Sequence, residues 1–126
     1  MKEQWAVILD GLYEISNLGR ARSVTRTTKD GRVYRGRILK LAPDSSKYLM
    51  FCSSRDGIRK SYRVHPFVAK KFLGRRPAGH IIDHVDGNKK RSVVSNLEYV
   101  THAESQRRAS ALGLLPTEKN GRWRRP

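Results

Sequence analysis

Residues 81–89 read IIDHVDGNK and residues 95–101 read SNLEYVT. The two isoleucines predict a short strand that carries Asp83 and His84 to its end. The Asp-Gly-Asn triplet that follows consists of residue types that favour a reversal of the chain. Residues 97–100 then predict a second short strand. We therefore expect a strand, a loop and a strand, with a carboxylate and an imidazole side by side where the first strand ends.

A helix is predicted directly after the second strand. Thr101 and Glu104 match a T-x-x-E capping box, in which the threonine caps the backbone and the glutamate reaches back. The helix is expected to end near Gly113. Residues 114–126 contain too few apolar side chains to fold alone, and Trp123 among arginines suits an arm that contacts nucleic acid. A solvated, disordered end is the alternative.

The charge of the chain narrows the choice of partners. Lysine and arginine number 27 against 11 acidic residues, which gives a formal net charge of +16 spread over both halves of the chain. Because such a charge repels itself in a compact protein, we expect a polyanion to neutralise it. Nucleic acid is the leading candidate, and a structural RNA-binding protein would be equally basic. A membrane surface fits less well, because the basic residues do not lie on long amphipathic helices.

Cysteine usage and the N-terminal residues indicate the compartment. Cys52 is the only cysteine, so the sequence predicts neither an internal disulfide nor a cysteine-based zinc site. The first residues lack the apolar run of a signal peptide, and no segment approaches the ~18 consecutive apolar residues of a membrane span. We expect a soluble, intracellular protein without membrane contact.

The first 64 residues predict an antiparallel sheet of hairpins, because Asp-Gly and Asn-x-Gly turn signals separate short runs rich in aromatic and β-branched residues. Expected strands include residues 33–39, 48–51 and 58–64. Residues 65–74 predict a short helix with Pro66 in its first turn and Gly74 past its end. His65, at the start of this helix, is interpreted as a structural histidine.

The order of strand, loop, strand and helix around D-H-x-D-G-N-K and S-N-L-x-x-V-T resembles the ββα-metal finger of the HNH endonucleases. Trp5 and residues 13–23 also resemble the small β-rich, DNA-contacting module that often precedes this finger in phage and intron nucleases of the homing type. The resemblance implies an enzyme that hydrolyses phosphodiester bonds of double-stranded DNA with a divalent metal, by a nick or a double-strand cut. It also implies a monomer in the cytoplasm of a bacterium or of a phage-infected host cell.

Three residues carry this chemistry. Asp83 offers hard carboxylate oxygens to Mg²⁺, or alternatively Mn²⁺, and the resemblance makes it the first metal ligand. His84 is expected to be largely neutral at neutral pH, because the surrounding positive charge disfavours its imidazolium form, and it is assigned as the general base. By resemblance, Asn96 is the middle asparagine that holds the loop carrying the histidine. No structural zinc is expected, because His80 and His84 lie too far apart on a strand.

The chain departs from the family pattern on the last helix. Where relatives commonly place an asparagine or histidine as second metal ligand, the matching position is Ser105, a poorer ligand. His102, one turn earlier on the same face, is the rival ligand. Glu104 could also bind the metal if it leaves its cap. A weakened or inactive site is the remaining alternative.

The resulting prediction is an α+β protein with a β-rich module at 1–64, an HNH finger at 65–112 and a basic tail at 113–126. The alternative function is a DNA-binding protein that keeps the finger but has lost hydrolysis. Basic side chains throughout the chain are the expected DNA contacts: Arg20, Arg22, Arg26, Arg32, Arg35, Arg37, Arg75, Arg76, Lys89, Lys90, Arg107, Arg108, Arg122, Arg124 and Arg125.

Overall fold

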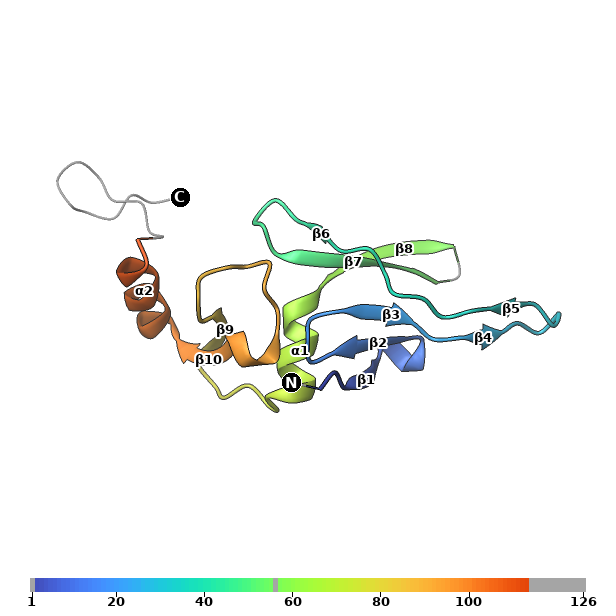
Figure 1. Ribbon diagram of the computed structural model, residues 1–126, viewed down its shortest axis with the longest axis horizontal. Helices are drawn as coiled ribbons and strands as arrows, with labels where there is room; N and C mark the ends of the chain where they lie inside the picture. Colours follow the sequence, from blue (N-terminus) through green and yellow to red (C-terminus); the bar gives the residue numbers. More distant parts are fainter. Residues whose placement is uncertain (1, 56, 114–126) are drawn as a thin grey trace.

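The computed structural model describes residues 2–55 and 57–113 of the chain, and over these residues all strand pairs are antiparallel. The α+β fold class is confirmed, with two α-helices in the described residues. Helix α1 lies in the middle of the molecule, α2 lies at one end, and a thin ribbon made of β4 and β5 projects at the other end (Figure 1). Neither helix is long and apolar enough to cross a membrane.

The N-terminal part contains three small sheets. The first has the strand order β1-β2-β3, the second pairs β4 with β5, and the third has the order β6-β7-β8. Their bounds are β1 Trp5–Ile8, β2 Tyr13–Ser16, β3 Ala21–Ser23, β4 Arg26–Thr27, β5 Val33–Tyr34, β6 Ala42–Pro43, β7 Leu49–Arg55 and β8 Ile58–Arg63, with a 3-10 turn at Leu9–Gly11 between β1 and β2.

The expected strand at residues 33–39 is wrong in its second half. β5 ends at Tyr34, and the chain then turns to the edge of β3. There, the Ser23 N–H donates to the Arg37 carbonyl over 2.9 Å, and the Leu39 N–H donates to the Ala21 carbonyl over 2.8 Å. Residues 35–39 therefore form hydrogen bonds with the backbone groups at the free edge of the first sheet, and they do not continue the ribbon.

Helix α1 (Val64–Phe72) follows β8 without a linker and supplies the centre of the core. Val64, Val68 and Ala69 on this helix are fully buried, and they share one cluster with Phe51 of β7, Leu97 and the buried side chains of the first sheet. Burial of a Val, Leu or Phe side chain contributes about 1.5–3 kcal/mol. One continuous core therefore joins the N-terminal sheets to the segment that follows α1.

The predicted finger is present. It consists of β9 (His80–His84), a 3-10 turn (Val94–Asn96), β10 (Leu97–Thr101) and α2 (His102–Ala111). Thr101 caps α2, because its hydroxyl accepts the Glu104 N–H over 3.2 Å. The Glu104 carboxylate accepts from the Thr101 hydroxyl over 3.0 Å, so the capping box closes through the two side chains. Glu104 is thus retained at the cap.

The turn after β2 anchors the finger loop to the first sheet. The Val94 N–H donates to the Asn17 carbonyl over 2.8 Å. Gly19 has a φ of +83°, and a Cβ at this position would lie 2.9 Å from the backbone oxygen of Ser92. Only glycine allows both this backbone conformation and this close approach.

We therefore expect Gly19→Ala to destabilise the protein more than Gly31→Ala does. Gly31 has a similar φ of +87° but open space around it, so its replacement should cost only the left-handed backbone penalty of about 1–2 kcal/mol. The Gly19 variant should lose at least about 1 kcal/mol more, because Ser92 must move. Urea unfolding followed by tryptophan fluorescence measures both, and equal losses would show that the contact with Ser92 is unimportant.

Candidate active site

Asp83 and His84 project from opposite faces of the β9–β10 pair, because successive side chains of a strand alternate. Asp83 lies opposite Glu98 in the register, and His84 lies opposite Leu97. Asp83 contacts α2, whereas His84 is directed toward the N-terminal part and the start of α1. The strand end thus presents the carboxylate and the imidazole to two different surroundings.

On the first face, α2 engages both oxygens of Asp83. The Ser105 hydroxyl donates to Oδ1 over 3.4 Å, and the Arg108 Nη1 donates to Oδ2 over 2.7 Å. Nη2 of the same guanidinium donates to Oε2 of Glu98 over 3.3 Å. Burial opposes the charge of Arg108, but the two carboxylates outweigh it and raise the pKa of Arg108 above its usual value.

The donor set at Asp83 fits a small hard cation. Around Mg²⁺, oxygen ligands at about 2.1 Å place neighbouring ligand atoms about 3.0 Å apart. The 3.4 Å between Asp83 Oδ1 and Ser105 Oγ is close to this spacing. Among the described residues, no group of three or more His, Cys, Asp or Glu side chains could hold a metal ion. A metal at Asp83 would therefore depend on water and phosphate oxygens for its remaining ligands.

The structure places Ser105, and not His102, beside Asp83. His102 is exposed at the first position of α2, and within residues 2–55 and 57–113 the contacts of α2 with the Asp83 carboxylate come from Ser105 and Arg108. Ser105 lies three residues further on, on the side of the helix that faces β9. Ser105 therefore has a better position for a metal ligand than His102.

On the second face, His84 is packed in a cluster of rings. The residue is 5% exposed, and the centroid of its ring lies 5.1 Å from that of His65 in an edge arrangement. Tyr48 stacks on His65 at 4.7 Å and also contacts His84 at 5.8 Å. Nε2 of His84 and Nδ1 of His65 are buried, and neither has a hydrogen-bond partner among the residues that the structure describes. These are surroundings in which a charged imidazolium is unfavourable.

Burial is the largest cause of a lowered pKa at His84, and Lys89 adds to it, while Asp83 and Asp86 act in the opposite direction. The sequence attributed the neutral imidazole to the positive field, whereas the structure adds burial as the stronger cause. Burial also lowers the pKa of His65 to about 4, helped by His84 and Arg63. Both rings are therefore neutral at neutral pH, and a neutral His84 can accept a proton.

The acid sensitivity of the fold should depend on His65. In the unfolded chain His65 has a pKa near 6.5, against about 4 in the fold, so the unfolded state binds more protons between these values and stability falls as the pH falls. This amounts to about 2 kcal/mol between about pH 8 and about pH 5. His65→Phe keeps a ring against Tyr48 and removes the titrating nitrogen, so urea unfolding should show a flatter pH dependence in this variant. An identical slope in both proteins would contradict the burial of a neutral His65.

Asn96 ties the two ends of the finger loop together. It is buried, its Oδ1 accepts the Asp86 N–H over 3.2 Å, and its Nδ2 donates to Asp86 Oδ1 and to the Arg91 carbonyl, each over 2.9 Å. Asp86 Oδ1 also accepts the Asn88 N–H over 2.8 Å, which is an Asx turn. The Asn96 carbonyl accepts from the Val85 N–H over 2.8 Å. The backbone that follows His84 is therefore held by Asn96.

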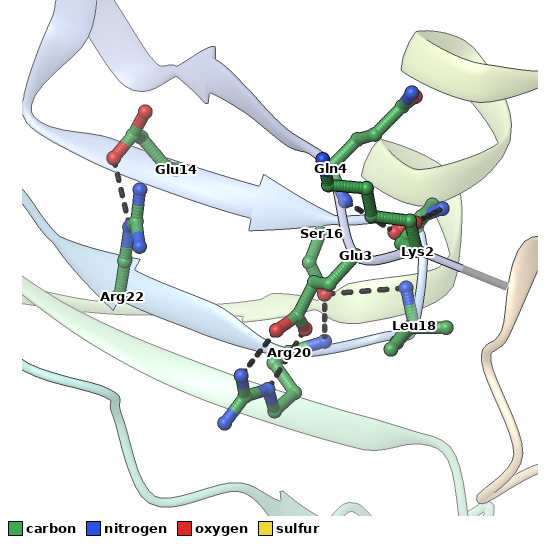
Figure 2. A network of polar contacts seen from close by, with 9 residues as sticks. Lys2, Glu3, Gln4, Glu14, Ser16, Leu18, Arg20 and Arg22 are labelled. Atoms are coloured by element: carbon green, nitrogen blue, oxygen red, sulfur yellow. Dashed lines mark hydrogen bonds and ion pairs between the residues drawn. The ribbon is translucent and has the colours of Figure 1, made fainter.

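The basic residues expected to contact DNA fall into separate groups. Arg20 pairs with Glu3, Arg22 pairs with Glu14 over 2.9 Å, and Arg32 pairs with Asp30 over 3.5 Å. Figure 2 shows Arg20 and Arg22 directed at these two glutamates. Lys89 lies over the ring of Tyr48, while Lys90 and Arg107 are exposed. Arg122, Arg124 and Arg125, with the rest of residues 114–126, lie outside the described residues.

Most of the other residues expected to contact DNA line two cavities. One of about 620 Å³ lies between the ribbon and β7–β8, and its basic lining residues are Arg26, Arg35, Arg37, Lys40 and Arg59. A second of about 720 Å³ is bounded by α1 and the finger, and its basic lining residues are Lys70, Arg75 and Arg76. The sequence indicated five of these eight residues and missed Lys40, Arg59 and Lys70, which no local pattern sets apart.

The sequence reasoning also missed residues beside the site. Glu98 and the inward position of Arg108 were not expected, although the i, i+3 spacing from Ser105 was a usable signal for Arg108. Tyr48 was expected only as a strand residue, and its contact with His84 depends on packing between segments far apart in the sequence.

Family models match two segments of the chain. Residues 62–107 match the HNH endonuclease model, and residues 3–52 match the NUMOD4 motif. Both segments correspond to the parts that the sequence distinguished by motif.

Similar proteins carry the same type of domain. The SPbeta prophage-derived putative HNH homing endonuclease YosQ of Bacillus subtilis is 42% identical over 64 residues, which are 48% of this chain and 37% of YosQ. DNA endonuclease I-HmuI of Bacillus phage SP01 is 29% identical over 110 residues, which are 87% of this chain and 58% of I-HmuI. The chain thus spans about a third to three fifths of the length of these relatives.

A solved structure that describes DNA binding and cleavage by the HNH homing endonuclease I-HmuI has a TM-score of 0.71 and 28% identity to this chain, and the match covers 93% of this chain and 63% of that one. The resemblance inferred from the D-H and S-N-L motifs is confirmed. The chain therefore contains an HNH endonuclease domain at residues 62–107, which a NUMOD4 motif at residues 3–52 precedes.

Proposed function

We propose that the chain is a DNA endonuclease that hydrolyses phosphodiester bonds with one divalent metal, with Asp83 as metal ligand and His84 as general base. The observation that carries the proposal is the end of β9, where a carboxylate beside the Ser105 hydroxyl is followed directly by a buried, neutral imidazole. The names of the relatives support the same activity.

In this mechanism His84 accepts the proton of the attacking water, which a neutral imidazole can do at neutral pH. Asp83 and Ser105 would hold the metal, with Mg²⁺ preferred for an all-oxygen set and Mn²⁺ as the alternative. When bound, the metal supplies Lewis-acid stabilisation of the charge on the phosphate and on the leaving oxygen. Asn96 is a positioning residue, because it fixes the backbone that follows His84.

The substrate in this proposal is double-stranded DNA bound by a monomer inside a bacterial or phage-infected cell. The net charge of +16 and the cationic cavities beside the ribbon and α1 support backbone contacts on a polyanion. Relatives from a phage and a prophage support the setting.

A specific observation favours the alternative, a DNA-binding protein with weak or no hydrolysis. Ser105 supplies a hydroxyl where an amide or imidazole is expected, and Arg108 already engages Oδ2 of Asp83. A short ligand and a competing cation both weaken metal capture.

One pair of measurements separates the two functions. Anisotropy with a labelled DNA duplex in EDTA measures binding, and incubation of supercoiled plasmid with Mg²⁺ measures cleavage. The endonuclease binds and cleaves, whereas the binding protein only binds. Preference for an RNA duplex of the same length would contradict both and favour a structural RNA-binding protein.

Replacing Ser105 by asparagine should strengthen metal capture. The amide oxygen reaches one atom further from the backbone toward Asp83 and is a better ligand than a hydroxyl. We expect the Mg²⁺ concentration for half-maximal cleavage to fall about tenfold, which corresponds to about 1.4 kcal/mol.

The matched control is Ser110→Asn, which adds the same amide to an exposed position of α2. His102→Ala tests the rival ligand and should leave the Mg²⁺ dependence unchanged. If Ser105→Asn has no effect and His102→Ala abolishes cleavage, the metal is held by His102.

A further inference from the structure

Arg108 occupies a position at the candidate metal site that its role as a DNA contact does not explain. Its side chain is 28% exposed, and its guanidinium forks between two carboxylates that project from the same face of β9 and β10. The shorter contact, 2.7 Å, is to Oδ2 of Asp83, and the longer, 3.3 Å, is to Glu98. Charge-assisted contacts of this length are among the stronger polar interactions of a protein.

This contact affects the atoms that a metal needs. With Ser105 on Oδ1 and Arg108 on Oδ2, α2 engages both oxygens of Asp83. The side chain of Asp83 is only 18% exposed, so water screens the pair weakly. A divalent cation beside Asp83 would lie next to a fixed positive charge and would be repelled by it.

We propose that Arg108 is a built-in competitor for the metal at Asp83, and that Glu98 is the position to which its guanidinium withdraws when the metal binds. The proposal rests on the proposed function in one respect, the assignment of Asp83 as metal ligand. It adds a residue that sets how much metal the site requires.

The register of the sheet explains why Glu98 can do this. Asp83 and Glu98 are direct cross-strand partners, so their side chains are neighbours on one face. The Glu98 side chain is 52% exposed, whereas that of Asp83 is 18% exposed, so Glu98 offers the more hydrated of the two partners. When the contact between Nη1 and Asp83 is lost, Arg108 keeps Glu98 as its counterion, and α2 can stay in place. The guanidinium is thus never left as an unpaired, partly buried charge.

The test measures metal binding to the full chain without DNA, by titration with Mn²⁺ followed by calorimetry and by the electron paramagnetic resonance signal of free Mn²⁺. Arg108→Gln removes the charge and keeps a polar, though shorter, side chain. It should lower the dissociation constant for Mn²⁺ about tenfold, the lower end expected for a hydrogen bond to a charged group.

Two variants control for general charge effects. Arg107→Gln removes the same charge from an exposed neighbour on the same helix and should change Mn²⁺ affinity by less than about twofold, because solvent screens it. Arg108→Lys keeps the charge but cannot fork between two carboxylates, and its affinity should lie nearer to the parent than to Arg108→Gln. Far-ultraviolet circular dichroism checks that each variant is folded.

Glu98 is tested in a double-mutant cycle. Glu98→Gln in the parent leaves Arg108 with Asp83 alone and should weaken Mn²⁺ binding several-fold. In the Arg108→Gln background the same change should have little effect, because there is no guanidinium to pair with the carboxylate at position 98. Additive effects would show that Glu98 acts only as a nearby charge and would overturn its assigned role.

The proposal is overturned if Arg108→Gln binds Mn²⁺ no more tightly than Arg107→Gln, or if no variant binds Mn²⁺ at millimolar concentration. Its failure is distinguishable from that of the proposed function. If the chain cleaves DNA but the variants bind Mn²⁺ equally well, only the competitor role of Arg108 is contradicted. If Arg108→Gln shows the tenfold gain in Mn²⁺ affinity but the chain does not cleave DNA, only the proposed endonuclease activity is contradicted.

Discussion

His84→Ala should reduce the rate of DNA cleavage by about 10²–10⁴, the range typical for loss of a general base. The imidazole is buried among His65, Tyr48 and the end of β9, where burial keeps it neutral and able to accept a proton. Because the imidazole carries no charge, it contributes little to contacts with phosphate. Affinity for DNA in EDTA should therefore be almost unchanged.

Removing a buried ring also leaves a cavity, so the variant needs a folding control. Circular dichroism and DNA anisotropy should match the parent, while single-turnover cleavage falls. His102→Ala is the matched control, because it removes an exposed imidazole of the same domain. Cleavage by His84→Ala at the parental rate would refute the assignment of the base.

Asp83→Ala should remove most of the metal binding. The replacement deletes the one carboxylate that also contacts Ser105, and Arg108 remains paired with Glu98. Even partners outside the ligand shell typically contribute 10–100-fold to metal affinity, so loss of the ligand itself should weaken it by at least about 100-fold. Calorimetric titration of the DNA complex with Mg²⁺ measures the change.

Asp83→Asn is the companion variant, because it keeps the size of the side chain and an oxygen for metal but removes the charge. We expect it to bind metal more weakly than the parent and more tightly than Asp83→Ala. Unaltered Mg²⁺ uptake by both variants would show that Asp83 is not a metal ligand. It would also contradict a metal site formed by Asp83 and Ser105.

The finger could be predicted from the sequence because its signals are local. A strand end, an Asx turn and a capping box each depend on residues within a few positions of one another. Thr101 makes the predicted capping contact, and Asp86 lies in the predicted chain reversal, where its carboxylate accepts the Asn88 N–H. β9, β10 and α2 accordingly lie where their patterns indicated, within one or two residues.

The surroundings of the site could not be predicted in this way, because they depend on register and on packing between distant segments. The pairing of Asp83 with Glu98 follows from the alignment of two strands, which a shift by one residue would change. Tyr48 reaches His84 only because the core joins β7, α1 and the finger. Residues 35–39 failed as a strand for the same reason, since the edge of β3 competes for their backbone groups.

The central claim is that Asp83 and His84 form a metal-dependent site that cleaves DNA. Its most direct test begins with the protein bound to supercoiled plasmid in EDTA, after which excess Mg²⁺ is added and the topological forms are followed by gel electrophoresis. We predict that the supercoiled form persists until Mg²⁺ is added and is then converted to nicked or linear plasmid by the parent but not by His84→Ala. Plasmid that stays supercoiled after Mg²⁺ addition, although the protein is bound to it, would contradict the claim.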